Sequence, residues 1–465
     1  MSEIVSIFLV QFDVKVGYKI VWSKSTIDIS LDGIEFKCLP SGIEEFSEDL
    51  IPFTHFHNDE IYYGVSKFRQ NMKTDRDQIK MFSVGVLCKP KNNSWMPNSF
   101  ISNGFQYVPC LDDLLSDYIN GNDRLTVPEF KFEDIRPRKF VSPLLSLPSF
   151  LNRFGPLIFR IFKLSLLRKN IIIVNKSKRD NYELAIFTYL ISIISLIPSM
   201  KIDVKQPHYS QPLYNISLND IEKLPPHYIA VTNDEIILNQ PVYDIAIIID
   251  ETPKIMTYES IRSGKNIISK ATYNDYLKFK VIYEELKDDA ASIANSSSSI
   301  NLSQVNNTRW GYETSWWDNV TPVSWTQYIW SAFSWFASAG QMNDDVVDRV
   351  VTREDTVPSI EHPVINHRGS FNSQLSQLTM FEGDVLEFVE IVGFFHKLTK
   401  KWIYLINEIV MDELYHGEVE INYSDLVDLE LDPYSEGDIE FLKEFVMNYW
   451  DVDSVEISSG LKFFC

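Results

Sequence analysis

At 465 residues the chain is too long for a single hydrophobic core, and its length predicts two to four domains. A net charge of −21 argues against nucleic-acid binding as the main function. The charge is uneven, because residues 151–205 carry ten Lys and Arg against three Asp and Glu, whereas residues 379–465 carry five against twenty. One basic segment therefore lies on an acidic chain, as either a partner surface or an ordinary solvated face.

The first 121 residues predict a small α+β domain. Apolar and β-branched runs predict four strands in a meander, over residues 3–12, 18–22, 61–68 and 80–88. The stretch 28–47 is interpreted as irregular, and a helix is expected over 111–119. Residues 122–148 are polar and contain four prolines, so they are interpreted as a linker.

Residues 149–291 predict a central α/β domain. Apolar residues at three- and four-residue spacing predict a helix over 157–168. Four consecutive β-branched residues, Ile171–Val174, predict a short central strand that is buried on both faces. Tyr182–Leu196 is apolar almost throughout and predicts a buried helix. Further elements are expected as strands over 228–231 and 242–249 and as an amphipathic helix over 272–294.

The remaining chain predicts a helical C-terminal part. A Ser/Asn-rich linker is expected over 292–308, and a polar loop over 343–378. Residues 379–465 predict an acidic, all-α part with a helix over 381–414 that is interrupted or kinked near Gly393. A second helix is expected over 439–449.

Residues 309–342 form a tryptophan-rich segment that is expected to be helical. Its uncharged stretch, residues 323–340, is about the length of a helix but too short to span a bilayer by itself. It is interpreted either as a core helix between domains or as an interfacial membrane helix. In the second interpretation Trp325, Trp330 and Trp335 would anchor it in the membrane surface.

Motifs for covalent catalysis are absent from the sequence, and we predict no catalytic residues, no cofactor and no metal site. Ser263-Gly264-Lys265-Asn266 lacks the remaining residues of a phosphate-binding loop. His55 and His57 could ligate a metal, but no partner set has suitable spacing, so a polar loop is preferred. The four cysteines show no paired spacing, which is typical of a reduced, intracellular protein.

Several phrases resemble the LCHN group of DENN proteins and are similar to it over roughly residues 3–290. These phrases are IVSIFLVQFD at 4–13, GIEFK at 33–37 with LPSG at 39–42, MFSVGVL at 81–87 and FKLSLLRKNIII at 162–173. The resemblance implies a tripartite DENN module: a longin-like sheet domain, a central α/β domain and a downstream α-helical part. The tryptophan-rich segment resembles an extension found in fungal members.

The resemblance further implies a partner, a Rab-type small GTPase, and guanine nucleotide exchange in vesicle trafficking. Such a protein would be cytoplasmic, with peripheral contact with intracellular membranes left open. Two alternatives remain: a non-catalytic scaffold or tether, and a GTPase-activating subunit. The last would need an exposed arginine such as Arg153, Arg168 or Arg179.

A GTPase-contact surface is predicted where basic residues lie at the two ends of the central strand. These residues are Arg168, Lys169, Lys176, Lys178 and Arg179. Loops at the strand ends of α/β layers commonly bind ligands. For Arg168 and Lys169 the alternative is that they cap the preceding helix, whose C-terminus favours positive charge. For Lys176–Arg179 the alternative is a solvated turn.

Overall fold

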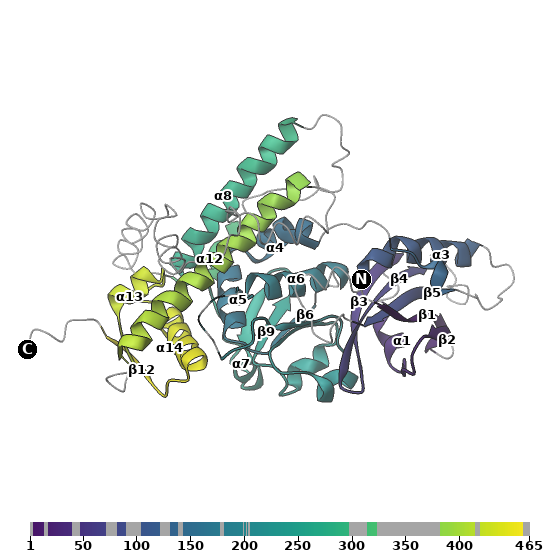
Figure 1. The fold of residues 1–465 in the computed structure, drawn as a ribbon, viewed down its shortest axis with the longest axis horizontal. Coiled ribbons are helices and arrows are strands. Elements are labelled where there is room, and N and C mark those ends of the chain that lie inside the picture. Colours follow the sequence, from purple (N-terminus) through teal and green to yellow (C-terminus); the bar gives the residue numbers. More distant parts are fainter. Residues whose placement is uncertain are drawn as a thin grey trace, which may run out of the picture.

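The computed structural model contains an N-terminal sheet domain, a central α/β domain and a group of C-terminal helices (Figure 1). The N-terminal domain and the C-terminal helices lie at opposite ends of an elongated molecule, with the central domain between them. This confirms the predicted α/β and α+β multidomain architecture. The structure describes residues 3–13, 17–39, 47–70, 81–89, 104–120, 131–137, 143–176, 181–198, 200, 202, 205–296, 314–322, 382–413 and 419–458.

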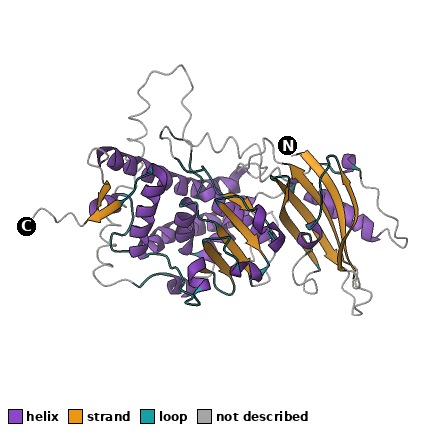
Figure 2. Ribbon diagram, turned by 90° about the horizontal axis from the view of Figure 1, so that it is seen from below, coloured by secondary structure: helices purple, strands orange, loops and turns teal. Residues whose placement is uncertain are grey.

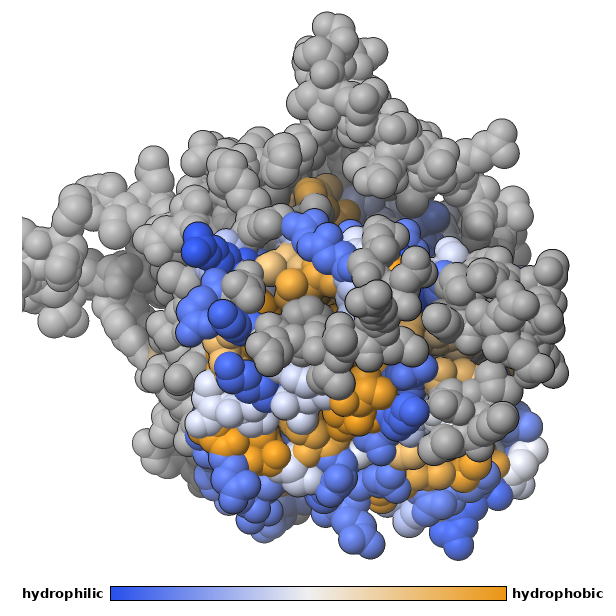
Figure 3. Space-filling view, turned by 90° about the vertical axis from the view of Figure 1, so that its right-hand side faces the viewer, coloured by the Kyte–Doolittle hydropathy of each residue, from blue (hydrophilic) through white to orange (hydrophobic). Residues whose placement is uncertain are grey.

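The N-terminal domain is a five-stranded antiparallel sheet in the order β2-β1-β5-β4-β3. Its strands are β1 (Glu3–Asp13), β2 (Gly17–Ser25), β3 (Glu48–His57), β4 (Glu60–Gln70) and β5 (Met81–Lys89). Helix α3 (Val108–Asn120) covers one face, and the short helix α1 (Ile34–Lys37) packs on the other. Apolar and hydrophilic side chains form separate small patches on the outer end of this domain (Figure 3).

Two sequence predictions about this sheet are wrong. The four strands exist, but β1 lies between β2 and β5, so the sheet is not a simple meander. Strand β3 was missed, and His55 and His57 belong to it rather than to a polar loop. Pro52 lies within β3, and a proline argues against a central strand because it lacks an N–H donor. The fold tolerates it because β3 is an edge strand.

The central domain contains a second five-stranded sheet, in the order β10-β9-β6-β8-β7 (Figure 2). Its strands are β6 (Ile171–Asn175), β7 (Gln211–Leu213), β8 (Tyr228–Thr232), β9 (Ile245–Ile249) and β10 (Lys254–Thr257). All neighbours are parallel except β10, which runs antiparallel to β9. The prediction that Ile171–Val174 forms a buried central strand is confirmed.

Helices cover the two faces of β6 unequally. Ile171 and Ile173 pack in the main core with α4 (Leu147–Phe154), α5 (Leu157–Leu166) and α6 (Asn181–Ile194). Ile172 and Val174 point to the other core, beneath η7 (Leu218–Lys223), η8 (Glu235–Asn239) and α7 (Tyr258–Arg262). Almost every residue of α6 is buried, which confirms the buried helix predicted after the central strand, over Tyr182–Leu196.

The C-terminal part consists of α12 (Glu382–Glu413), α13 (Tyr423–Asp428) and α14 (Glu436–Trp450), beside α8 (Tyr273–Ser296). Helix α12 continues through Gly393, so the predicted interruption is wrong. Buried Val392 and Phe395 pack on both sides of the glycine, and this packing offsets its weak helix propensity. The part is also not all-α, because β11 (Val419–Asn422) pairs with β12 (Val455–Ser458).

A buried ionic cluster joins this part to the central domain. Lys163 of α5 places its Nζ 2.8 Å from Asp275 of α8 and 2.6 Å from Asp438 of α14. Each of the three side chains is only 1% exposed. Burial alone would lower the pKa of Lys163, but the two carboxylates outweigh it and hold that pKa above its ordinary value. The ammonium's contribution to stability is therefore present at neutral pH and is lost only above pH 10.5.

Replacing Ile172 with Asp should prevent soluble expression, because an unpaired carboxylate in this core costs several kcal/mol. The matched control is Ile27→Asp, since Ile27 is 41% exposed and should accept the charge. Soluble yield and far-UV circular dichroism measure the outcome. A soluble, native-like Ile172→Asp protein would contradict the assigned core.

Replacing Lys163 with Met should lower the free energy of unfolding by roughly 3–5 kcal/mol, because two buried carboxylates lose their partner. Urea unfolding followed by tryptophan fluorescence measures the loss. The triple variant Lys163→Met, Asp275→Asn, Asp438→Asn removes all three charges and should recover most of the stability. An exposed ion pair contributes about 1 kcal/mol or less to stability. If Lys163→Met lowers the free energy of unfolding by no more than that, the buried cluster does not stabilise the fold as described.

Candidate functional site

The junction between the N-terminal and central domains is formed by the edge strand β3. The backbone N–H of Thr54 donates to the carbonyl of Tyr214 at 2.7 Å, and the N–H of Tyr214 donates to the Thr54 hydroxyl at 2.8 Å. Tyr63 of β4 donates its hydroxyl hydrogen to the carbonyl of Pro212 at 3.1 Å. Tyr214, just after β7, therefore satisfies part of the open edge of the N-terminal sheet, and with the Tyr63–Pro212 bond it fixes the two sheets relative to one another.

A buried ion pair crosses the same junction. Lys37 of α1 lies 2.7 Å from the carboxylate of Asp220 in η7, and it also donates to the carbonyl of Thr54 at 2.6 Å. Asp220 is held in place by Ser217, whose backbone N–H donates to it at 2.7 Å in a capping box. Burial lowers the pKa of Lys37, and the charge of Asp220 opposes that shift.

An asparagine network lies at the carboxyl ends of β6 and β8. Asn175 donates to Asn233 at 2.9 Å, and Asn233 donates to Asn181 at 2.5 Å and to Asn215 at 3.3 Å. Asn181 then donates to Asp49 of β3 at 2.9 Å. Sequence reasoning missed this network. The available signal was that Asn175 and Asn233 stand at or just after the ends of two predicted strands.

This edge of the sheet is where ligands usually bind in open α/β folds. Here neighbouring amides and Asp49 satisfy one another across the domain junction. Amides of this kind supply hydrogen bonds and no nucleophile or titrating group near neutral pH. The arrangement is therefore suited to positioning a protein surface rather than to covalent chemistry.

The predicted GTPase contacts do not form one patch, because they lie at opposite ends of β6. Lys176 is at the carboxyl end, beside the asparagine network, and forms an exposed 2.8 Å ion pair with Glu235. Lys178 and Arg179, the next basic residues, lie outside the described residues.

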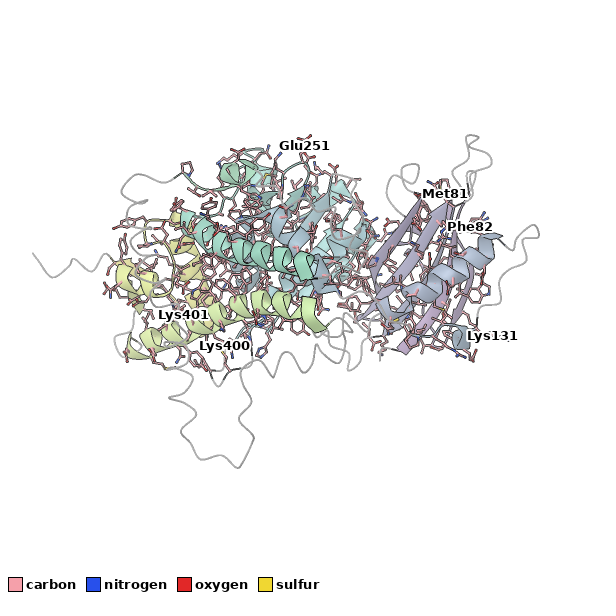
Figure 4. The ribbon with its side chains drawn as sticks, turned by 90° about the horizontal axis from the view of Figure 1, so that it is seen from above. Met81, Phe82, Lys131, Glu251, Lys400 and Lys401 are labelled. Carbon is pink, nitrogen blue, oxygen red and sulfur yellow. The ribbon has the colours of Figure 1, made fainter. Side chains whose placement is uncertain are left out.

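Glu251, two residues past β9, lies at the surface of this domain, on the opposite side from Lys400 and Lys401 of α12 (Figure 4).

Arg168 and Lys169 lie at the amino end of β6. Arg168 is 3% exposed, and its guanidinium donates to the carbonyls of Pro207 at 2.8 Å and Ser165 at 3.1 Å. Ser165 is in the last turn of α5, so this is the contact that the helix-capping interpretation expected. Lys169 is half-buried and pairs with Glu444 of α14. Both side chains thus make contacts that support the fold.

Trp325, Trp330 and Trp335 lie outside the described residues. Trp316, from the same predicted segment, is buried against Phe279 and Tyr283 of α8 and donates its indole N–H to the carbonyl of Asn152 at 3.3 Å. Its ring covers Gly155, where a Cβ would come within 2.7 Å of it. Within the described residues, every helix is too short or too polar to cross a bilayer.

His55 and His57 do not form part of a metal cluster. Among the described residues, no three His, Cys, Asp or Glu side chains come together as ligands would. His55 is buried in β3, with its ring Nε2 2.7 Å from the carbonyl of Ser30. Burial, assisted by the nearby charge of Lys37, lowers the pKa of His55 to about 4. His55 is therefore a neutral donor at neutral pH.

Comparison with known proteins covers both sides of this junction. A family model described as DENN domain-containing protein 11 matches residues 7–141 and 133–259, together more than half of the chain. The chain belongs to this family. The match includes the N-terminal sheet domain and strands β6–β10 of the central domain, so the DENN assignment predicted from sequence phrases is confirmed.

Relatives extend the similarity over the remaining chain. The "uncharacterized protein ANR2" of Saccharomyces cerevisiae is 26% identical over 98% of this chain and 93% of its own length. A DENN domain-containing protein 11 of Danio rerio is 27% identical over 53% of this chain and 54% of its own length. The "uncharacterized protein C119.16c" of Schizosaccharomyces pombe is 26% identical over 62% of this chain and 73% of its own length. A domain of unknown function, DUF4484, matches residues 320–418, which include Trp325, Trp330, Trp335 and the whole of α12.

Lowering the pH from 7.5 to 5.5 should destabilise the wild type by about 1 kcal/mol more than a His55→Gln variant. The folded-state pKa of His55 lies below the ordinary value of 6.5, so the unfolded chain takes up more protons over this range. Urea unfolding at both pH values measures the difference. Equal pH dependence in wild type and His55→Gln would refute the assignment.

Proposed function

We propose that this protein binds a Rab-type small GTPase and promotes the exchange of GDP for GTP in intracellular membrane traffic. The observation that carries the proposal is the family match, which spans both the N-terminal and the central domains. DENN domains are generally associated with Rab GTPases. The junction supports the proposal because it holds the two matched domains in one geometry, so a partner can contact both at once.

Exchange needs no covalent step, in agreement with the chemistry of the junction. A protein that binds the nucleotide-free GTPase more tightly than the GDP-bound form weakens GDP binding by the same factor. It must therefore supply shape and a few charges that compete with the nucleotide. A preformed surface does this best, because little ordering is needed at the moment of binding.

The surface proposed for the GTPase is the carboxyl edge of the central sheet, where Lys176 is exposed and Lys178 and Arg179 follow. Lys176 pairs there with Glu235 at a site open to solvent. Exposed pairs of this kind contribute little to stability, so either member can exchange its partner at low cost. Lys176 can then face an acidic group of the GTPase.

A non-catalytic scaffold of the same family is the alternative function. A GTPase-activating role through Arg153 or Arg168 has less support, because both guanidinium groups donate to backbone carbonyls within the fold. The third candidate, Arg179, lies outside the described residues. The two leading functions differ in one measurable property. An exchange factor prefers the nucleotide-free GTPase, whereas a scaffold binds one loaded form without accelerating release.

The deciding experiment uses the purified full chain and a panel of Rab-type GTPases. Binding is measured for the nucleotide-free, GDP and GTP-analogue forms, and release of fluorescent GDP is followed with increasing amounts of the protein. Preference for a nucleotide-free form together with faster release supports exchange. Preference for a loaded form with unchanged release supports the scaffold, and no binding to any member of the panel rejects both.

Reversing the charges of Lys176, Lys178 and Arg179 to Glu should slow association with the GTPase roughly tenfold and make it less sensitive to salt. Thermal stability should change little, because the ion pair that Lys176 forms with Glu235 is exposed. Stopped-flow association at two ionic strengths gives both quantities. The control reverses three exposed basic residues at the amino edge of the sheet, Arg262, Lys265 and Lys270, and should associate normally. Unchanged binding by the first variant would place the contact elsewhere, across the N-terminal domain.

A further inference from the structure

A loop that follows α7 exposes two adjacent isoleucines. Residues 262–268 and Lys270 are exposed, with Ser269 half-buried at the base of the loop. Ile267 is 63% exposed and Ile268 is 40% exposed, and both count among the large apolar side chains that the described fold leaves open to solvent. Neither belongs to the apolar cores of the central domain. Two neighbouring aliphatic side chains at such a tip are unusual for a surface with no partner.

Internal hydrogen bonds hold the loop in this shape. The backbone N–H of Ile267 donates to the hydroxyl of buried Ser260 at 2.5 Å, and the N–H of Asn266 donates to the Ser260 carbonyl at 3.2 Å. Ser269 returns the chain to the sheet by donating its N–H to Ile255 of β10 at 2.7 Å. Gly264 has a φ of 70°, which suits a residue without Cβ at this turn. The isoleucines are therefore displayed outward by the fold.

The chain segment that carries the isoleucines is basic. Between residues 257 and 270 there are three basic residues, Arg262, Lys265 and Lys270, against one acidic residue, Glu259, on a chain whose net charge is −21. None of the three basic residues forms an ion pair within the described part of the chain, although many other lysines do. The positive charge around the two isoleucines is therefore available to a partner.

We propose that residues 262–270 form a membrane-contact loop that inserts Ile267 and Ile268 into an anionic lipid surface. Aliphatic side chains at the tip match the hydrocarbon below the headgroups, and basic side chains around them match the anionic headgroups. Without this local positive charge, an anionic membrane would repel the chain as a whole. The expected binding is weak and reversible, because only two side chains enter the apolar layer.

A bilayer fits the loop better than a protein partner does. Specific protein interfaces bury about 800 Å² per partner, whereas here only two exposed isoleucines of one short loop offer apolar surface. The loop is also at the amino edge of the central sheet, because Thr257 at the end of β10 pairs with Ile245 at the start of β9. Contact with a membrane there would leave the carboxyl edge free. The inference does not depend on GTPase binding.

The test uses the full chain and sedimentation with phosphatidylcholine vesicles, with or without phosphatidylserine. The wild type should bind only the anionic vesicles, and salt should weaken that binding. Ile267→Ser with Ile268→Ser should weaken binding roughly tenfold, through loss of apolar contact. Arg262→Glu, Lys265→Glu and Lys270→Glu together should abolish the preference for phosphatidylserine.

Matched controls separate the loop from general properties of the surface. Ile27→Ser changes an isoleucine of the N-terminal domain that is about as exposed as Ile268. Lys24→Glu, Lys131→Glu and Lys280→Glu together give the same change in net charge as the triple loop variant. Both should bind vesicles like the wild type. The loop variants should unfold at the wild-type temperature and bind any cognate GTPase normally in solution.

A fluorescent probe reports insertion directly. An environment-sensitive dye on Ile267→Cys, in a Cys465→Ser background, should shift to the blue when phosphatidylserine vesicles are added, and the same dye on Ile27→Cys should not. The remaining cysteines, Cys38, Cys88 and Cys110, are buried and should not react with the dye.

Three results would overturn the proposal. The first is absence of wild-type binding to anionic vesicles. The second is that both loop variants bind vesicles as tightly as the wild type does. If the triple variant Trp325→Ala, Trp330→Ala, Trp335→Ala then abolishes vesicle binding, the tryptophan-rich segment is the membrane contact instead of the loop. The third is loss of GTPase binding by loop variants that still bind vesicles, which would make the loop a protein contact. This third result concerns the loop variants only, so it can be told apart from a failure of the charge reversal at Lys176, Lys178 and Arg179.

Discussion

The buried contact of Lys163 with Asp275 and Asp438 is the constraint on which the arrangement of the C-terminal helices depends. Taking three charges out of water is unfavourable unless all three meet in good geometry. Here α5, α8 and α14 each supply one charge, and each side chain is almost fully buried. Asp438 also accepts the backbone N–H of Asp432, so the turn before α14 is part of the same cluster. The central domain and the C-terminal helices are thus stable in one relative position.

The other side of the central domain is joined by the same physical means. Lys37 and Asp220 form a buried pair, and the asparagine network extends from β6 and β8 to Asp49 of β3. Apolar contacts alone would tolerate small sliding movements, whereas buried hydrogen bonds are costly to leave unmade. The two family-matched domains therefore present a surface of fixed geometry, which is what a partner that contacts both of them requires.

The central sheet separates two surfaces of different character. At its carboxyl edge, amide groups satisfy one another beside an exposed lysine that already has a carboxylate partner. At its amino edge, a rigid loop exposes isoleucines among basic side chains that have no ion-pair partner within the described residues. The proposed exchange activity and the proposed membrane contact would therefore use opposite edges of one sheet, so both contacts could be made together.

The sequence by itself determined the central strand Ile171–Val174, the buried helix that follows it and the DENN family, because β-branched runs, apolar spacing and family phrases are all local. Only the tertiary structure decided which charged residues are buried. Lys163 and Arg168 look alike as basic residues of an apolar helix, yet one meets carboxylates 112 and 275 positions away and the other meets backbone carbonyls. Strand β3 was likewise hidden by Pro52, which is compatible with a strand only at a sheet edge. The position of a strand in its sheet, the ion-pair partners of a side chain and its burial all depend on residues far apart in the chain. Local sequence patterns therefore cannot predict them.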